Sequence, residues 1–219
     1  MSSCFFSLPA CGKGLASAMA LPYRAANPGE RRTQAMIFPL FRREPRGPDT
    51  ISTLYGMIVA QARLPCFYRD YAIADTVNGR FDLIVLHLAL VLDRLAQDPA
   101  LQSLGQGVFD RFCQDMDDNL REMGIADLKV PKEMRRMGEA YYGRSQAYRA
   151  TLAANDNGLL VEALARNIYG GSPAALAAAP RLAAYMREAL RDLAGQDSAS
   201  LAGAALRLPD PATIPATTR

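Results

Sequence analysis

Apolar residues recur every three or four positions along most of the chain between residues 49 and 194. The pattern is clearest over 108–123, where Phe109, Phe112 and Met116 share one side and aspartates occupy the others. This spacing is typical of a helix that packs one face against a core. Sustained alternation of apolar and polar residues is not found, so the sequence predicts an all-α fold.

The apolar period and its interruptions predict a single bundle of about six or seven helices. Residues 81–97 are apolar on nearly every side, which predicts the central helix of the bundle. The Asn78-Gly79 pair predicts a turn-rich loop over 72–79, and Pro180 predicts a kink or break in the last helix. The other helices are expected at about residues 50–62, 66–71, 108–123, 130–154, 159–169 and 173–194.

Composition divides the chain into a helical domain and differing ends. We expect the domain over 49–171, followed by an amphipathic helix over 172–194. Residues 195–219 are rich in Ser, Ala, Pro and Thr, which predicts a disordered tail. Residues 1–35 show no period, and we expect them to be disordered, a targeting extension or untranslated, with 36–48 as an apolar–basic segment.

Charge and length exclude several classes of protein. The net charge of +3 is too small to indicate a nucleic-acid-binding protein, and we expect no DNA partner. Crossing a bilayer needs about 20 consecutive apolar residues. The best run, over 83–92, is shorter and contains His87, which favours a buried core helix. Contact with a membrane is therefore expected at its surface only.

The sequence offers no pattern of catalytic or metal-binding residues. The four cysteines form no Cys-x-x-Cys pair, and a zinc site needs about four clustered ligands. Cys66 and Cys113 lie among apolar residues and are expected to be buried thiols. His87 is the only histidine, and we predict a hydrogen-bonded core residue, with haem ligation as the alternative. We expect no enzymatic activity, no metal and no cofactor.

Several segments in a fixed order carry a resemblance to a known family. They include DTVNGRFD at 75–82, FDRFCQDMDDNLREMGIADLKVPK at 109–132 and MGEAYYGR at 137–144. Over about residues 37–170 the chain resembles the ubiquinol–cytochrome c chaperones, which assist assembly of the cytochrome bc1 complex. The likeness rests on the succession of segments rather than on any one of them.

The resemblance implies a non-enzymatic assembly chaperone. Its client would be newly made cytochrome b or another bc1 subunit, and a partner chaperone and weak contact with the ribosome or membrane surface are also implied. The expected location is cytoplasmic, at the inner face of the inner membrane, with the mitochondrial matrix side as the alternative. Two other functions stay open: a helical binder of a lipophilic cofactor such as quinone or haem, and an adaptor that docks on the ribosome or membrane.

A group of cations near the start of one predicted helix is the first candidate binding site. Positive charge at a helix N-terminus opposes the helix dipole, which favours a binding role over a local structural one. Anionic lipid, ribosomal RNA or an acidic client segment would suit it, and a solvated helix face is the alternative. This basic cluster consists of Lys129, Lys132, Arg135 and Arg136.

Further candidates for partner binding lie on the neighbouring segments. Adjacent aromatic residues cannot both face one core, so we expect Tyr142 to be exposed beside Arg144 and to suit an interface. An acidic helix face suits contact with a positively charged client, and a solvated helix face is the alternative. The loop before the central helix presents one more cation, which either binds a partner or pairs with Asp75 or Asp82. These candidates are Asp115, Asp118 and Arg80.

The segment over 36–48 is the candidate for membrane contact. A short apolar and aromatic stretch is followed by arginines, a composition that suits weak binding to a membrane surface. The candidate residues are Phe38, Phe41, Arg42 and Arg43.

Overall fold

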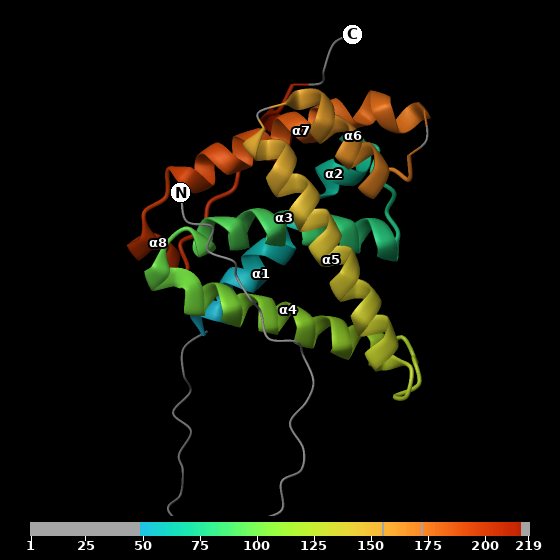
Figure 1. The fold of residues 1–219 in the computed structure, drawn as a ribbon, viewed down its shortest axis with the longest axis vertical. Coiled ribbons are helices and arrows are strands. Elements are labelled where there is room, and N and C mark those ends of the chain that lie inside the picture. Colours follow the sequence, from blue (N-terminus) through green and yellow to red (C-terminus); the bar gives the residue numbers. More distant parts are fainter. Residues whose placement is uncertain (1–48, 155, 172, 216–219) are drawn as a thin grey trace, which may run out of the picture. The chain divides into compact units, whose positions relative to one another are not determined.

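The apolar run of residues 83–92 forms the middle of helix α3 (Val77–Ala96), and other helices surround it. The computed structural model describes residues 49–154, 156–171 and 173–215. Within this part, α3 contacts α1, α4, α5 and α7, and Figure 1 shows α5 crossing over it. All side chains from Leu83 to Val91 are buried. The predicted central helix is therefore confirmed.

The described residues form eight α-helices, one of them only five residues long, two 3-10 helices and no strand. The predicted all-α bundle is confirmed. The α-helices are α1 (Thr50–Ala62), α2 (Pro65–Asp70), α3 (Val77–Ala96), α4 (Gln102–Glu122), α5 (Val130–Ala153), α6 (Asn157–Asn167), α7 (Pro173–Ala194) and α8 (Ser198–Ala202), and the 3-10 helices are η1 (Pro99–Leu101) and η2 (Pro211–Thr213).

An aromatic cluster between α2, α3 and α7 forms the centre of the core. The ring of Phe67 lies 5.0 Å from the ring of Tyr185 and 5.4 Å from that of His87, both in edge-to-face geometry. Phe67 and Tyr185 are fully buried, and burial of such large rings contributes strongly to stability. Cys66 beside this cluster is buried as predicted, whereas Cys113 on α4 is only half-buried.

Helix α3 begins at Val77, four residues before the predicted start at Phe81, so the expected loop over 72–79 is shorter than predicted. Thr76 caps the helix, because its hydroxyl accepts a hydrogen bond from the backbone N–H of Gly79. A Cβ atom at Gly79 would lie 2.0 Å from the carbonyl oxygen of Ala74. Glycine at this position therefore permits a close approach inside the first helical turn rather than a turn between helices.

The C-terminal part differs from the disordered tail that we predicted for 195–219. Residues 195–215 are placed against the core, with Leu206 and Ile214 buried. The guanidinium of Arg181 on α7 donates hydrogen bonds to the carbonyl oxygen of Ile214. Helix α7 itself runs through Pro180 without a break.

Residues 1–48 lie outside the part of the chain that the structure describes, and with them the segments predicted over 1–35 and 36–48. The four candidates for membrane contact, Phe38, Phe41, Arg42 and Arg43, belong to this stretch. Among the described helices, none combines the length and the apolar composition that a transmembrane span requires.

Candidate functional site

The turn between α4 and α5 carries the basic cluster. Gly124 follows the end of α4 with φ of +77°, a conformation that glycine adopts without steric cost. The N–H of Ile125 donates to the carbonyl oxygen of Leu120 over 3.1 Å, which closes the helix end. Val130, the first residue of α5, is only 1% exposed and anchors the other side of the turn. Hydrogen bonds and one buried side chain thus hold the turn in a defined conformation.

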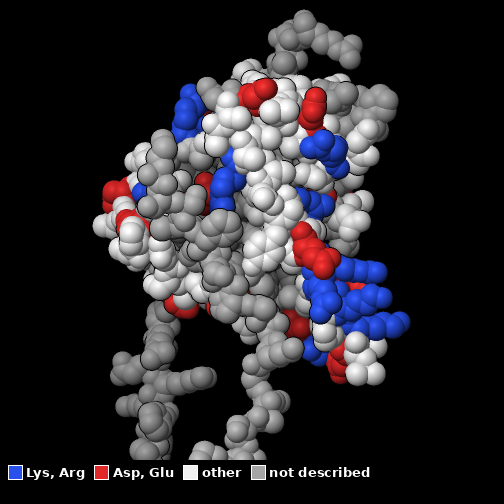
Figure 2. Space-filling view, in the orientation of Figure 1, with Lys and Arg blue, Asp and Glu red and all other residues white. Residues whose placement is uncertain are grey.

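All four members of the basic cluster are exposed. Arg136 pairs with Glu133 over 3.1 Å, whereas Lys129, Lys132 and Arg135 form no ion pair with any residue that the structure describes. Figure 2 shows Lys and Arg side chains gathered at the lower right, where Figure 1 has the turn from α4 into α5. Three of the four cations are therefore exposed charges without an ion pair among the described residues.

Tyr142 lies on the exposed side of α5, with 48% of its surface accessible. Its ring packs 5.4 Å from the ring of the buried Tyr141 and 6.2 Å from that of Phe109. Arg135 and Gly138 lie seven and four positions before Tyr142, so the three residues share one face of the helix. This α5 face combines a supported aromatic ring with a cation.

Gly138 has no evident role inside the molecule. A Cβ atom at this position would meet no atom of the described residues within 4 Å. Glycine inside a helix costs about 1 kcal/mol relative to alanine, because it loses more backbone freedom on folding. Packing within the described residues therefore does not explain why position 138 of the α5 face is a glycine.

Arg144 is directed into the structure, in contrast to the exposed position that we predicted. Its guanidinium pairs with the carboxylate of Asp82 on α3 over 2.9 Å and lies over the ring of Phe81. Burial raises the pKa of Asp82 to about 6, although the positive charge of Arg144 acts in the opposite direction. The pair joins α5 to α3, so we assign Arg144 to the fold rather than to a binding surface.

The remaining candidates do not converge on one site. Asp115 accepts a hydrogen bond of 2.7 Å from the hydroxyl of Tyr55, which ties α4 to α1. Arg80 pairs with Asp75 over 2.7 Å at the start of α3. Asp118 is exposed on α4. Of these three residues, only Asp118 keeps the exposed and unpaired character among the described residues that partner binding requires.

His87 is a hydrogen-bonded core residue, as predicted. The carbonyl oxygen of Leu83 can only accept, so Nδ1 of His87 carries the proton that is donated to it over 2.7 Å. Nε2 then accepts from the hydroxyl of Tyr185 over 2.8 Å, and that hydroxyl accepts from Gln61. Burial lowers the pKa of His87 to about 4. Because both ring nitrogens are occupied and the residue is 0% exposed, ligation of haem iron would require the core to open.

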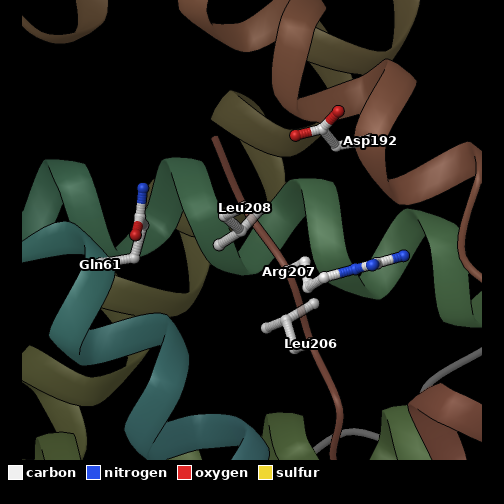
Figure 3. A pocket seen from close by; sticks show the side chains of 5 residues that line it. All are labelled: Gln61, Asp192, Leu206, Arg207 and Leu208. Carbon is white, nitrogen blue, oxygen red and sulfur yellow. The ribbon is translucent and has the colours of Figure 1, made fainter. Parts of the chain in front are cut away.

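A surface pocket of about 590 Å³ lies beside the C-terminal segment. Figure 3 shows Gln61 of α1, Asp192 of α7 and residues 206–208 around it. Sites for lipophilic ligands have mostly apolar walls, whereas three of these five side chains are polar or charged. No group of three or more potential metal ligands occurs among the described residues. The pocket does not match a quinone or haem site.

The sequence analysis did not identify two residues of α5 and of the turn before it, Gly138 and Leu128, as candidates for binding. Gly138 lies within the string MGEAYYGR, and only its open surroundings in the structure make its position informative. Leu128 is 96% exposed between Asp127 and Lys129. The signal available in the sequence was a leucine between two charged residues, which by itself does not distinguish exposure from burial.

Comparisons with known proteins place the chain in a family. The family model described as ubiquinol–cytochrome C chaperone matches residues 69–208. The crystal structure of the Cbp3 homolog from Brucella abortus is similar, with 36% sequence identity and a TM-score of 0.68, over 76% of this chain and 92% of that chain. No curated protein matches the chain significantly. The chain therefore belongs to the ubiquinol–cytochrome c chaperone family.

Proposed function

We propose that this protein is a non-enzymatic chaperone that binds newly made cytochrome b and promotes its assembly into the bc1 complex. The observation that carries the proposal is the family match over residues 69–208, which takes in most of the helical bundle. The chaperone acts at the cytoplasmic side of the inner membrane, where an unassembled membrane client emerges. The surface pocket beside the C-terminal segment, with three polar or charged side chains among the five that line it, does not favour a lipophilic-cofactor binder.

The α5 face with Arg135, Gly138 and Tyr142 is our proposed contact for the client. Aromatic and arginine side chains are enriched at protein interfaces, and the ring of Tyr142 is already fixed by its neighbours. A glycine lets the backbone of another helix approach closely. Such a surface suits an apolar helical client with charged ends.

The function is tested in a strain that lacks the gene. We expect the b-type haem signal of the bc1 complex and bc1 activity in membranes to fall together, with other respiratory complexes unchanged. The full-length gene should restore both signals. Unchanged bc1 levels in the deletion strain would refute the assignment of the client.

The proposed contact surface is tested by photocrosslinking. A photoreactive amino acid at position 142 should capture cytochrome b, whereas the same group at Leu159 on α6 should not. Both side chains are 48% exposed, so the control matches the accessibility of the test position. Equal capture from the two positions, or capture from position 159 alone, would place the client on another face of the chaperone.

A further inference from the structure

The turn between α4 and α5 presents two apolar side chains to solvent. Leu128 is 96% exposed and Met123 is 54% exposed. Val130, two residues after Leu128, is 1% exposed, so the same short segment both anchors itself in the core and displays a leucine outward. A single exposed leucine is common on protein surfaces. Leu128 differs from such a residue because basic side chains lie next to it in the sequence.

Residues 123–136 carry four cations, Lys129, Lys132, Arg135 and Arg136, against two acids, Asp127 and Glu133, which leaves a net charge of +2. Arg121 pairs with Asp117 over 2.7 Å and with Asp127, so its single positive charge balances one of these two acids. Glu133 is taken up by Arg136. Lys129, Lys132 and Arg135 form no ion pair among the described residues, and neither do the exposed acids of the flanking helical turns, Asp118, Glu122 and Glu139.

The turn is also held in place before any partner arrives. The carbonyl oxygen of Ala126 accepts hydrogen bonds from the N–H groups of Lys129 and Val130, over 2.7 and 3.3 Å. Together with the closed end of α4 at Gly124, these bonds fix the direction in which Leu128 points. Little conformational entropy therefore remains to be lost when the turn binds a surface.

We propose that residues 123–136 dock on the surface of an anionic phospholipid bilayer. Leu128 and Met123 enter the headgroup region, and Lys129 and Lys132 bind lipid phosphates. Exposed apolar side chains next to a group of cations are the composition that favours an interfacial position on an anionic membrane. RNA would be bound by the cations alone and would gain nothing from burying an exposed leucine. The docking is independent of which client the chaperone holds.

The chain contains no tryptophan, which permits a direct test of insertion. In the full-length protein, L128W should show a blue shift and increased intensity of tryptophan emission with vesicles of phosphatidylcholine and phosphatidylglycerol. Vesicles of phosphatidylcholine alone should produce no shift. L159W on α6 provides the control, since Leu159 is exposed but lies away from the cluster, and its emission should not change.

Cosedimentation with the same vesicles separates the charged and apolar contributions. Replacing Lys129 or Lys132 by Gln should weaken binding about fivefold for each lysine. Leu128→Ser should weaken it by about tenfold, as expected for partial burial of one leucine side chain. Raised salt should weaken binding of the unaltered protein through screening of the lysines. Arg166→Gln on the exposed side of α6 serves as the charge control and should bind normally.

Two results would overturn the proposal. If vesicle binding is not weakened by Lys129→Gln, Lys132→Gln or Leu128→Ser, another part of the chain makes the membrane contact. Absence of vesicle binding, together with capture of a protein client from position 128, would show that the turn recognises protein instead. Circular dichroism of each variant checks that it is folded. We expect no loss of folding, because the substituted side chains are exposed.

Discussion

Helices α3 and α5 have similar lengths, 20 and 24 residues, but opposite surroundings. In α3 every side chain from Leu83 to Val91 is buried, and even its histidine forms two hydrogen bonds within the core. In α5 only Val130, Tyr141 and Tyr148 are buried. The first helix is stabilised by burial along its length, whereas the second is attached at a few points.

The contrast indicates which positions are available for function. Changes in α3 alter the core, since close-packed interiors tolerate little loss of volume. The exposed face of α5 can vary at little cost to folding, yet it holds Gly138, which lowers helix stability, and Tyr142, which is half-exposed. Residues that folding does not require are the best candidates for contacts with a partner.

The largest expected effect separates the core from the α5 face. Phe67→Ala should lower the free energy of unfolding by about 3–5 kcal/mol, because a fully buried ring is replaced by a cavity. Tyr142→Ala should cost about 1 kcal/mol or less, because much of that ring is already in contact with water. Urea denaturation followed by circular dichroism measures both values. Similar losses at the two positions would remove the distinction between the regions.

The pH dependence of stability tests whether the buried His87 is neutral in the core. His87 has a pKa of about 4 in the folded protein against an ordinary value of 6.5, so the unfolded chain binds the proton more readily. The contribution of the neutral His87 to the free energy of unfolding is therefore fully present above pH 6.5 and is lost as the pH falls towards 4. The loss amounts to about 3 kcal/mol. Asp82 acts in the opposite direction, since its raised pKa favours folding at low pH.

A comparison of variants isolates the histidine from other titrating groups. The stability advantage of the unaltered protein over His87→Gln should be constant above pH 6.5 and shrink by about 3 kcal/mol by pH 4. His87 is the only histidine, so its imidazole NMR signals should show directly that no titration occurs between pH 7 and 5. A constant difference down to pH 4, or titration near pH 6.5, would contradict the buried neutral imidazole.

The fold was predictable from the sequence wherever its determinants are local. The period of apolar residues identified the helices, and the continuous apolar run identified the central one. The start of α3 was misplaced because Asn78-Gly79 resembles a turn, and the contact with Ala74 that requires glycine is visible only in three dimensions. Composition suggested a disordered C-terminal tail, yet bonds from Arg181 and Gln196 hold residues 206–214 in place.

The same division applies to the candidate site. The exposed basic cluster could be predicted, because the helix start and the four cations beside it are close together in the sequence. The partner of Arg144 is 62 positions earlier, at Asp82, and no local pattern indicates that pairing. Exposure of Leu128 and the open space at Gly138 depend on how α4 and α5 meet the remaining helices. Long-range contacts therefore decided which candidates stayed on the surface.

A smaller effect is expected where the C-terminal segment joins the core. The carboxamide of Gln196, 3% exposed, accepts from the backbone N–H of Arg207 and donates to its carbonyl oxygen. Gln196→Ala should cost about 2 kcal/mol, because both backbone groups lose their partner. Hydrogen exchange should show reduced protection of the Arg207 amide. Ser200→Ala, which removes an exposed hydrogen bond nearby, should leave that protection intact, and equal exchange in the two variants would mean that Gln196 does not hold the segment.

The smallest expected effect on stability is also the most direct test of the α5 face. Gly138→Ala and Gly56→Ala each add a methyl group inside a helix where no described atom lies within 4 Å, so each should raise the free energy of unfolding by about 0.5–1 kcal/mol. If the α5 face binds the client, Gly138→Ala should lower recovery of bc1 activity in the deletion strain despite its greater stability. Gly56→Ala on α1 should restore activity fully. A stabilised Gly138→Ala variant with full activity would show that the client does not approach α5 at this glycine.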